Sequence, residues 1–484
     1  MQKHTLLWFR QDLRLADHPA LQAALQTECP ILPIFILDDD DAETRRIGGA
    51  ARWWLHESLT ALDADLRVRG SRLLCFRGKA GDILQKLCNQ YHVESVFWNR
   101  SYVPQVQKRD AAVKAALKQH NITAQSFASY LLFEPWQIKT GAGKPYRVFT
   151  PFSKACMAAE WTGAGQLFAA PEAVPAPQQF PAGTTIAELD LLPPKDWYKE
   201  MAQLWQPGEN GAQSSWRGFL NGGIAAYQEQ RDFPNTEGVS RLSPHLHWGE
   251  IAPARLRVDM AAATEKYPDR QARHYAFLRQ VLWREFSYHL LDQLPDMAEK
   301  PLNENFTRMK WENDSALLTA WQQGKTGYPL VDAGMRQLWR TGWMHNRVRM
   351  IAASFLIKDL FIDWRIGEKY FWDTLLDADP ANNAAGWQWV AGCGADAAPY
   401  FRIFNPVLQS KKFDAAGGYI RAFVPELANL PDKYLHAPWE APDNVLEQAG
   451  LVLGKDYPYP VVDHAAARDK ALAIYKHDIK QETA

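Results

Sequence analysis

Short apolar runs alternate with amphipathic segments over the first 130 residues of the chain. Five runs have the length and composition of buried strands: 6–9, 31–37, 72–76, 95–98 and 123–127. Three segments between them have the apolar spacing of helices: 51–69, 80–91 and 105–120. This alternation predicts a Rossmann-like α/β domain over residues 1–131, with a parallel sheet covered by helices on both faces.

The pattern changes twice after this first domain. Residues 132–205 are non-periodic and contain the proline-rich run PEAVPAPQQFPAG (171–183), which predicts a long interdomain linker. Helical periodicity then dominates with hardly any strand signal, so residues 206–484 are predicted to form an all-helical domain. The run GAGK (141–144) lacks the Ser or Thr that follows the lysine of a phosphate loop, so it is not interpreted as one. The first domain lacks GxGxxG, which argues against a nicotinamide site.

Composition narrows the class of protein. The net charge of the 484 residues is −1, so contact with nucleic acid must come from a local basic patch. Five scattered cysteines without a CxxC pair argue against a zinc site and a disulfide framework, and no metal is expected. No apolar stretch reaches the roughly 18 residues that span a membrane, which predicts a soluble protein. The scattered cysteines fit a reducing cytoplasm, and a monomer is expected. Twenty tryptophans suit large cores, stacking on flat ligands or electron transfer.

The stretch Gly342–Trp389 concentrates polar chemistry. It reads as a long helix, an acidic loop and a tryptophan-rich turn. In the helix, i, i+4, i+7 spacing places Trp343, Arg347 and Met350 on one face, with Asn346 and Arg349 beside it. A buried amphipathic helix would explain an Arg349 that is paired with an acid, but it would not explain the neighbouring amide.

The acidic loop offers partners for that helix. Asp377 is expected to pair with Arg349 in a bidentate, partly buried contact. Asp379-Pro380 has the residue types of an N-cap and a first helical position, so a helix cap and a binding role are equally good interpretations of Asp379.

Several motifs resemble those of the DNA photolyases and cryptochromes. They are WFRQDLRLADHPAL (8–21), WMHNRVRM (343–350), DADPANNAAGWQW (377–389) and AAPYFRIFNP (397–406). Long motifs in the right order over the whole chain are far more specific than one short pattern. The resemblance is strongest to class I photolyases that repair cyclobutane pyrimidine dimers, and it implies FAD as cofactor and UV-damaged DNA as partner.

The resemblance also implies which residues bind the flavin. Hydroxyl and backbone N–H groups near the start of a helix suit its phosphates, although a plain helix cap is the alternative for Ser243 and Val239 stands where the family has threonine. The implied cofactor-binding residues are Tyr227, Ser240, Leu242, Ser243, Gln280, Arg284, Trp343, Asn346, Arg349, Asp377, Asp379 and Asn383.

Three of these residues would tune the flavin. Arg349 would place a cation near N1 of the reduced, anionic ring, and Asp379 would accept a hydrogen bond from the ring edge. Asn383 would lie beside N5, where many cryptochromes have an acid or a cysteine, so the neutral amide favours repair.

The substrate pocket needs flat walls and amide groups to hold a dimer that is flipped out of DNA. Gln280, Trp283, Arg284 and Ser287 share a helix face, and cores rarely place glutamine and arginine on an inward stripe. The residues expected to act on the substrate are Asn346, Met350, Asn383, Trp283, Trp389 and Gln280. Relatives that repair the (6-4) photoproduct have histidines at 346 and 350, whereas dimer repair enzymes commonly have Glu at 280.

Two further sets follow from the resemblance. Trp311, Trp364 and Trp387 match a three-tryptophan chain that passes electrons to the flavin, with ordinary buried indoles as the alternative. Five cations would position DNA phosphates around the pocket, although each alone suits a solvated surface. They are Arg231, Arg347, Arg402, Lys411 and Lys412.

The first domain carries a light-harvesting antenna chromophore in this family. The stretch from Asn99 to Tyr102 is not followed by the glutamate of folate-binding relatives, which weakens folate and leaves deazaflavin, a second flavin or none. The sequence therefore predicts light-driven repair of cyclobutane pyrimidine dimers by electron transfer from reduced FAD. A blue-light receptor (cryptochrome) and a (6-4) photoproduct lyase are the alternatives.

Overall fold

A five-stranded parallel sheet forms the core of the first domain in this computed structural model. The strands are β1 (His4–Phe9), β2 (Ile31–Leu37), β3 (Leu74–Arg77), β4 (Val93–Asn99) and β5 (Thr123–Phe127). Their order is β3-β2-β1-β4-β5, and every neighbouring pair is parallel. This is the order of the first five strands of a Rossmann sheet, which confirms the predicted α/β class.

The structure describes residues 2–39, 45–163, 167–397, 399–400 and 402–480. Residues 398 and 401, within the motif at 397–406, lie outside that description. None of the helices in the described ranges is long and apolar enough to cross a membrane.

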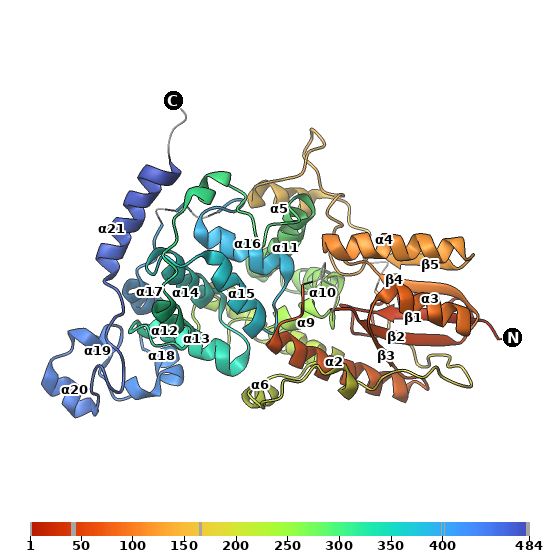
Figure 1. Cartoon of the computed structure of the whole chain (residues 1–484), viewed down its shortest axis with the longest axis horizontal. Helices are drawn as coiled ribbons and strands as arrows, with labels where there is room; N and C mark the ends of the chain where they lie inside the picture. The colour runs from red at the N-terminus through yellow and green to blue at the C-terminus, as the bar shows by residue number, and fades with distance from the viewer. Residues whose placement is uncertain (1, 40–44, 164–166, 398, 401, 481–484) are drawn as a thin grey trace.

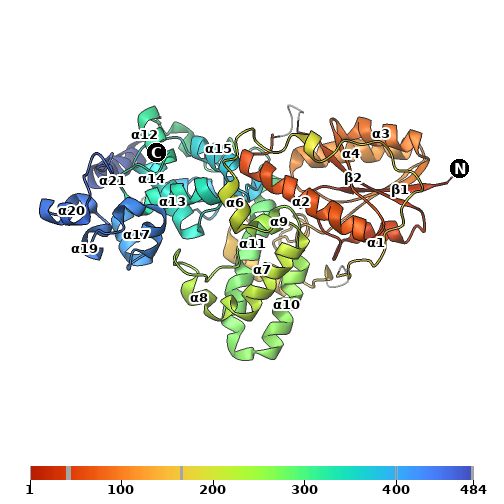
Figure 2. The same cartoon turned by 90° about the horizontal axis from the view of Figure 1, so that it is seen from below.

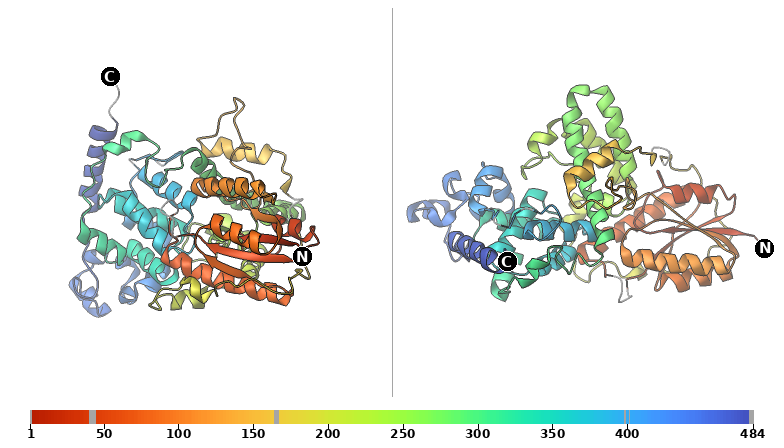
Figure 3. Two further views of the ribbon diagram at one scale, coloured as in Figure 1. Left: turned by 45° about the vertical axis from the view of Figure 1, so that its right-hand side comes forward. Right: turned by 90° about the horizontal axis from the view of Figure 1, so that it is seen from above.

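Helices cover both faces of the sheet (Figure 3). They are α1 (Pro19–Leu25), α2 (Gly49–Val68), α3 (Ala80–Gln90) and α4 (Pro104–Gln119). Side chains alternate along β1, so Leu7 and Phe9 pack in the core under α1 and α2, while Leu6 and Trp8 pack in the core under α3 and α4. The central strand β1 is therefore apolar on both sides, as its sequence indicates.

The predicted linker is only partly extended. It contains α5 (Phe149–Ala158), η2 (Ala187–Leu189) and α6 (Lys199–Leu204). Its chain runs back over the first domain, where Thr184 N donates to Cys75 O at 2.9 Å and Val174 N donates to Arg69 O at 2.9 Å. The linker therefore holds the sheet domain through backbone hydrogen bonds.

The remainder of the chain is helical, and no named strand follows β5 within the described ranges. One group of helices stands apart from the rest in Figure 2. It comprises α7 (Glu209–Asn221), α8 (Tyr227–Gln230), α9 (Ser243–His247), α10 (Pro253–Lys266) and α11 (Gln271–Gln293). Its core is distinct from that of the later helices, and α16 (Pro380–Ala391) contributes to both, with Ala381 and Ala384 in the first and Trp387 and Val390 in the second.

The later helices form the end of the molecule farthest from the sheet (Figure 1). They are α12 (Ser315–Gln322), α13 (Pro329–Thr341), α14 (Asn346–Lys358), α15 (Trp364–Thr374), α16 (Pro380–Ala391), α17 (Pro406–Phe413), α18 (Gly418–Phe423), α19 (Asp432–Leu435), α20 (Asp443–Ala449) and α21 (His464–Ile474). Short 3₁₀ or π segments precede or follow helices in both groups: η3 (Gly223–Ala226), η4 (Pro268–Arg270), η5 (Glu304–Arg308), η6 (Pro425–Leu427), η7 (Pro438–Glu440) and η8 (Tyr475–Ile479).

Two predictions about the stretch 342–389 are wrong. Gly342 ends α13 with a φ of 66°, and an added Cβ there would lie 2.6 Å from Leu376. Trp343 therefore lies in the connection before α14 and does not share a helix face with Arg347 and Met350. The tryptophan-rich segment is not a turn but the helix α16, because Asp379 caps its start.

Candidate functional site

Arg349 and Asp377 form the predicted ion pair beside the first turn of α14. Arg349 Nη2 lies 2.9 Å from Asp377 Oδ2, and Arg349 Nε donates to Met344 O at 2.7 Å. The pair is not bidentate, because Asp377 Oδ1 is buried without a hydrogen-bond partner among the described residues. The guanidinium is thus fixed by two contacts while its Nη1 makes no hydrogen bond in the described part of the chain.

Asp379 is a fully engaged helix cap, as one of its two interpretations predicted. Its Oδ1 accepts from the backbone N–H groups of Ala381 and Asn382 at 3.0 and 2.8 Å. Its Oδ2 accepts from Tyr288 Oη at 2.6 Å and from Tyr130 Oη at 3.2 Å. Any hydrogen bond from a ligand must therefore share an oxygen that already has protein partners.

The environment of Asp379 keeps it anionic. Burial alone would raise the pKa of this carboxyl group, but His247, Arg284 and Tyr288 outweigh burial and hold the pKa well below its usual range. His247 Nδ1 lies 3.6 Å from Asp379 Oδ2. A fixed negative charge therefore lies at the start of α16.

Asn383 is oriented by a buried carboxylate that the sequence did not reveal. Its Nδ2 donates to Glu368 O at 3.0 Å and to Glu368 Oε1 at 2.8 Å. Glu368 also receives a bidentate ion pair from Arg45, with both N–O distances at 2.7 Å. Arg45 lies 323 positions earlier and stacks 3.9 Å from the ring of Trp372, so no local pattern pointed to it. The amide nitrogen of Asn383 is committed to the protein, which leaves its oxygen for a ligand.

The start of α9 has no side-chain cap. Leu242 occupies the N-cap position, and Ser243 is the first helical residue, so the alternative of a serine cap is wrong. Ser243 Oγ instead accepts from Trp343 Nε1 at 3.3 Å, and Ser240 Oγ accepts from Leu242 N at 3.4 Å. The first-turn N–H groups of α9 consequently remain available, an arrangement that suits an anionic group.

The predicted polar face of α11 is buried or half-buried, and its members make different contacts. Arg284 is buried and donates to Tyr130 O at 2.8 Å. Ser287 Oγ donates to Trp283 O at 3.0 Å. One face of Trp283 is covered by Phe149, with ring centroids 3.7 Å apart and planes at 9°. Arg284 therefore holds the C-terminal end of the first domain at Tyr130, and Trp283 has only its other face for a flat ligand.

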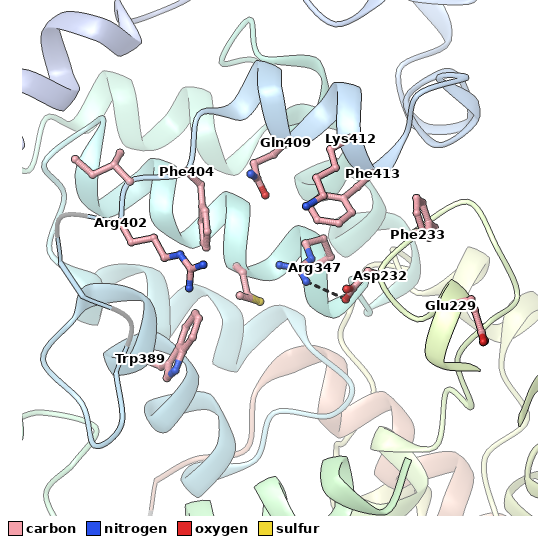
Figure 4. Close-up of a pocket in the computed structure, with 12 residues that line it drawn as sticks. Glu229, Asp232, Phe233, Arg347, Trp389, Arg402, Phe404, Gln409, Lys412 and Phe413 are labelled. Atoms are coloured by element: carbon pink, nitrogen blue, oxygen red, sulfur yellow. Dashed lines mark ion pairs between the residues drawn. The ribbon is translucent and has the colours of Figure 1, made fainter. Parts of the chain in front are cut away.

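A pocket of about 720 Å³ opens beside α14, α16 and α17 (Figure 4). It is lined by Glu229, Asp232, Phe233, Arg347, Met350, Trp389, Arg402, Ile403, Phe404, Gln409, Lys412 and Phe413. Five of the predicted site residues meet there: Arg347, Met350, Trp389, Arg402 and Lys412.

Other predicted site residues do not line this pocket. They are Gln280, Trp283, Asn346, Asn383, Arg231 and Lys411. Asn346 is exposed at the first position of α14, and its Nδ2 lies 3.8 Å from Met350 Sδ. Arg231 lies 5.5 Å from the ring centroid of Tyr227, which is buried, and Lys411 is exposed on α17. Within this set, Asn346 contacts Met350, and Arg231 Nε lies 4.0 Å from Asp232 Oδ1, so both are next to residues that line the pocket.

The pocket combines aromatic walls with a mixed charge at its mouth. Trp389, Phe404 and Phe413 supply flat apolar surface. Arg347 is paired with Asp232, a residue that sequence reasoning missed, at 2.9 Å between Nη2 and Oδ1 (Figure 4). No group of three or more His, Cys, Asp or Glu in the described ranges could hold a metal ion.

The three predicted electron carriers differ in burial. Trp387 and Trp364 are 3 % and 2 % exposed, whereas Trp311 is only partly buried. An added Cβ on Gly367 would lie 2.2 Å from Trp387, so this glycine permits the close approach of α15 and α16. Trp321, which was not predicted, lies edge-on to Trp387 with centroids 6.3 Å apart. Burial that increases from Trp311 inward fits a path from the surface, and the electron-transfer role stays a prediction.

Known proteins resemble this chain over nearly its whole length. Residues 5–178 match the family model described as DNA photolyase, and residues 277–477 match the FAD binding domain of DNA photolyase. A deoxyribodipyrimidine photo-lyase of Agrobacterium fabrum is 48% identical over 97% of both chains. Cryptochrome-1 of Arabidopsis thaliana is 36% identical over 96% of this chain and 69% of its own length. A crystal structure of a bacterial class III photolyase from Agrobacterium tumefaciens is 47% identical, with a TM-score of 0.93 and 98% of each chain covered.

An α/β domain joined to a helical domain that binds FAD defines the class of light-dependent flavoproteins. Within that class, the chain belongs to the DNA photolyase and cryptochrome family. The predictions of the family, of a photolyase-type enzyme and of FAD as cofactor are thereby confirmed. The solved relative from Agrobacterium tumefaciens is a class III photolyase, whereas the sequence motifs of this chain favoured class I.

Proposed function

We propose that the protein is a class III photolyase that repairs cyclobutane pyrimidine dimers in DNA under light. The observation that carries the proposal is the pocket in which Met350 and Trp389 lie beside the cations Arg347, Arg402 and Lys412. A flipped dimer needs flat walls, and its backbone needs positive charge at the rim. The Agrobacterium fabrum relative, a deoxyribodipyrimidine photo-lyase by name, supports the same reaction.

The described residues fit FAD at the neighbouring site. Uncapped N–H groups at the start of α9, with Ser240 and Ser243, would hold the phosphates. Arg349 would present its free Nη1 to the anionic ring, and Asn383 would present its amide oxygen. Reduced FAD bound there would supply the electron that splits the dimer after absorbing light. The protein's part is to bind, orient and exclude water, without a general acid or a nucleophile.

Repair by the purified protein tests the proposal directly. The reduced, FAD-loaded protein is mixed with a DNA oligomer that carries one thymine cyclobutane dimer, and intact thymines are measured after blue light and in the dark. Restoration in light alone is the expected result. A flavin-loaded protein that restores nothing would contradict the proposal, and an oligomer with a (6-4) photoproduct would then identify the other lyase activity.

Two variants separate the substrate pocket from the flavin site. Met350→His and Asn346→His are expected to abolish dimer repair while FAD stays bound, because these side chains lie 3.8 Å apart next to the aromatic wall. Full repair by both variants would show that the dimer binds elsewhere.

Trp311→Phe is expected to block photoreduction of the oxidised protein while repair by the pre-reduced protein continues.

A light-signalling role is the second candidate, favoured by the similarity to cryptochrome-1. The neutral amide at Asn383 argues for repair instead.

An antenna chromophore in the α/β domain is a further part of the proposal, with folate, deazaflavin and flavin as its possible identities. An archaeal photolyase from Sulfolobus tokodaii, 29% identical, is described with two FAD molecules. Extraction of the native protein followed by mass spectrometry would identify the second chromophore.

A further inference from the structure

Arg347 projects into the mouth of the pocket from the second residue of α14. Its Nη2 makes an ion pair with Asp232 Oδ1 at 2.9 Å, and its guanidinium carbon lies 4.5 Å from the ring centroid of Phe413 (Figure 4). Arg347 Nε has no hydrogen-bond partner among the described residues. Since a guanidinium carries five donor hydrogens, most of its binding capacity is unused in this arrangement.

Asp232 is poorly shielded and easily displaced. Its side chain is 40% exposed, and that of Arg347 is 21% exposed. Its Oδ1 also lies 4.0 Å from Arg231 Nε, at the outer limit of an ion pair. An exposed ion pair of this kind changes an equilibrium constant for folding or binding by only about twofold to fivefold. A phosphate can therefore replace the carboxylate at little cost to the fold.

The other cations of the pocket are not held in this way. Among the described residues, Arg402 and Lys412 have no carboxylate partner, although both line the pocket. The second acid of the lining, Glu229, lies 3.4 Å from Arg273 and not from a pocket cation. Asp232 is thus the acid of the lining that directly neutralises a cation of the lining.

We propose that Asp232 is an internal competitor of DNA phosphate for Arg347. The inference rests on the proposed function, in which a nucleotide flipped from DNA enters this pocket. Each phosphate that binds Arg347 must first displace the carboxylate of Asp232. Asp232 therefore lowers the affinity of the protein for the DNA backbone and raises the rate at which intact and repaired DNA dissociate. The device affects any phosphate backbone equally and sets affinity without reading sequence.

Binding measurements on charge-neutral variants test this inference. Fluorescence anisotropy in the dark compares the FAD-loaded wild type, Asp232→Asn, Arg347→Gln and the double variant, on undamaged and dimer-containing duplexes. Asp232→Asn is expected to bind both duplexes about twofold to fivefold more tightly and to release them more slowly. Its slope of log Kd against log salt should steepen by up to about one, because Arg347 then releases counterions without freeing an internal carboxylate.

The double variant supplies the decisive comparison. On the Arg347→Gln background, Asp232→Asn should have no further effect, because the cation that it liberates is gone. Glu229→Gln is the matched control, since it removes the other acid of the lining. Its small gain in affinity should be the same with and without Arg347, as expected of long-range charge alone.

Two outcomes would overturn the inference. One is an equal gain from Asp232→Asn on both backgrounds, and the other is weaker binding by Asp232→Asn. The proposed function fails separately, if the wild type binds DNA but does not restore dimers under light. An Arg347-dependent gain in such a protein would still establish the competition, while the repair activity would have to be abandoned.

Discussion

The polar groups on the two sides of α14 are held in opposite ways. On the side expected to face the flavin, Asp377, Asp379 and Glu368 are 8%, 4% and 1% exposed, and each contacts fixed protein donors. At the pocket mouth, Arg402 and Lys412 are exposed and have no ion pair among the described residues. Groups that set the electronic environment of a cofactor must be pre-organised, whereas groups that exchange DNA phosphates must be released easily.

The largest effect is expected from Asp379→Asn. The change removes the buried negative charge beside His247 and Arg284 and leaves one acceptor oxygen where the carboxylate has two, which lowers the free energy of unfolding by about 3–5 kcal/mol. Thermal denaturation measures the loss of stability, and the amount of bound FAD is measured alongside it. Asp363→Asn is the matched control, because Asp363 caps α15 from a more open position and asparagine is an equally good cap. Equal losses of stability in the Asp379 and Asp363 variants would show that the surroundings of Asp379 add nothing beyond an ordinary helix cap.

A smaller loss is expected from Arg45→Met. This change leaves the carboxylate of Glu368 buried without its cation, at a cost of about 1–3 kcal/mol, and loosens the hydrogen bond that orients Asn383. Chemical denaturation measures the loss, and the visible spectrum of bound FAD reports the change beside its ring. Arg46→Met is the control: it alters the adjacent exposed arginine and should leave the stability and the FAD spectrum unchanged. If the two variants behave alike, the pair with Glu368 does not stabilise the site.

A pH effect is expected from Lys358, which lies buried at the end of α14 and contacts the backbone beside the pocket. Its Nζ donates to Arg402 O at 3.2 Å, and burial lowers the pKa of Lys358 to about 7. Between about pH 7 and 10.5 the unfolded chain binds a proton that the folded chain does not, so this group makes stability rise with pH in that window. Lys358→Met should therefore be about 1–2 kcal/mol more stable than wild type near pH 7 and gain little at pH 10.

Thermal denaturation from pH 6 to 10 measures that difference. Below about pH 7 both states of the wild type carry the proton, and the gain should be constant. A gain that is independent of pH up to pH 10 would show that Lys358 is not buried in its neutral form. Lys412→Met, on the exposed face of α17, is the control and should show no such pH dependence.

The smallest effect is expected from Lys412→Gln. The side chain is exposed at the pocket mouth, so the free energy of unfolding should change by less than about 0.5 kcal/mol. Affinity for DNA should fall about twofold to fivefold, and the salt slope should decrease by about one. Anisotropy at several salt concentrations measures both. An unchanged slope would remove Lys412 from the set of phosphate-binding residues.

Local sequence sufficed for several residues of the site. Asp379-Pro380 predicted the start of α16, and the spacing of an acid after α14 predicted the Arg349–Asp377 pair. The cap depends on immediate neighbours, and the ion pair depends on charge attraction between residues 28 positions apart. By contrast, the prediction of a helix face with Trp343 was wrong, because Gly342 ends α13 and the next helix starts after His345.

The sequence by itself determined the sheet of five parallel strands, the helical second domain, the family and FAD as cofactor. Apolar periodicity and long motifs are local properties of a chain, and they survive folding unchanged. Only the tertiary structure decided that Arg45 reaches Glu368 across 323 positions and that Asp232 neutralises Arg347. It also decided that Phe149 covers one face of Trp283. The reason is physical: such contacts depend on how distant helices pack, and no spacing along the chain encodes that distance.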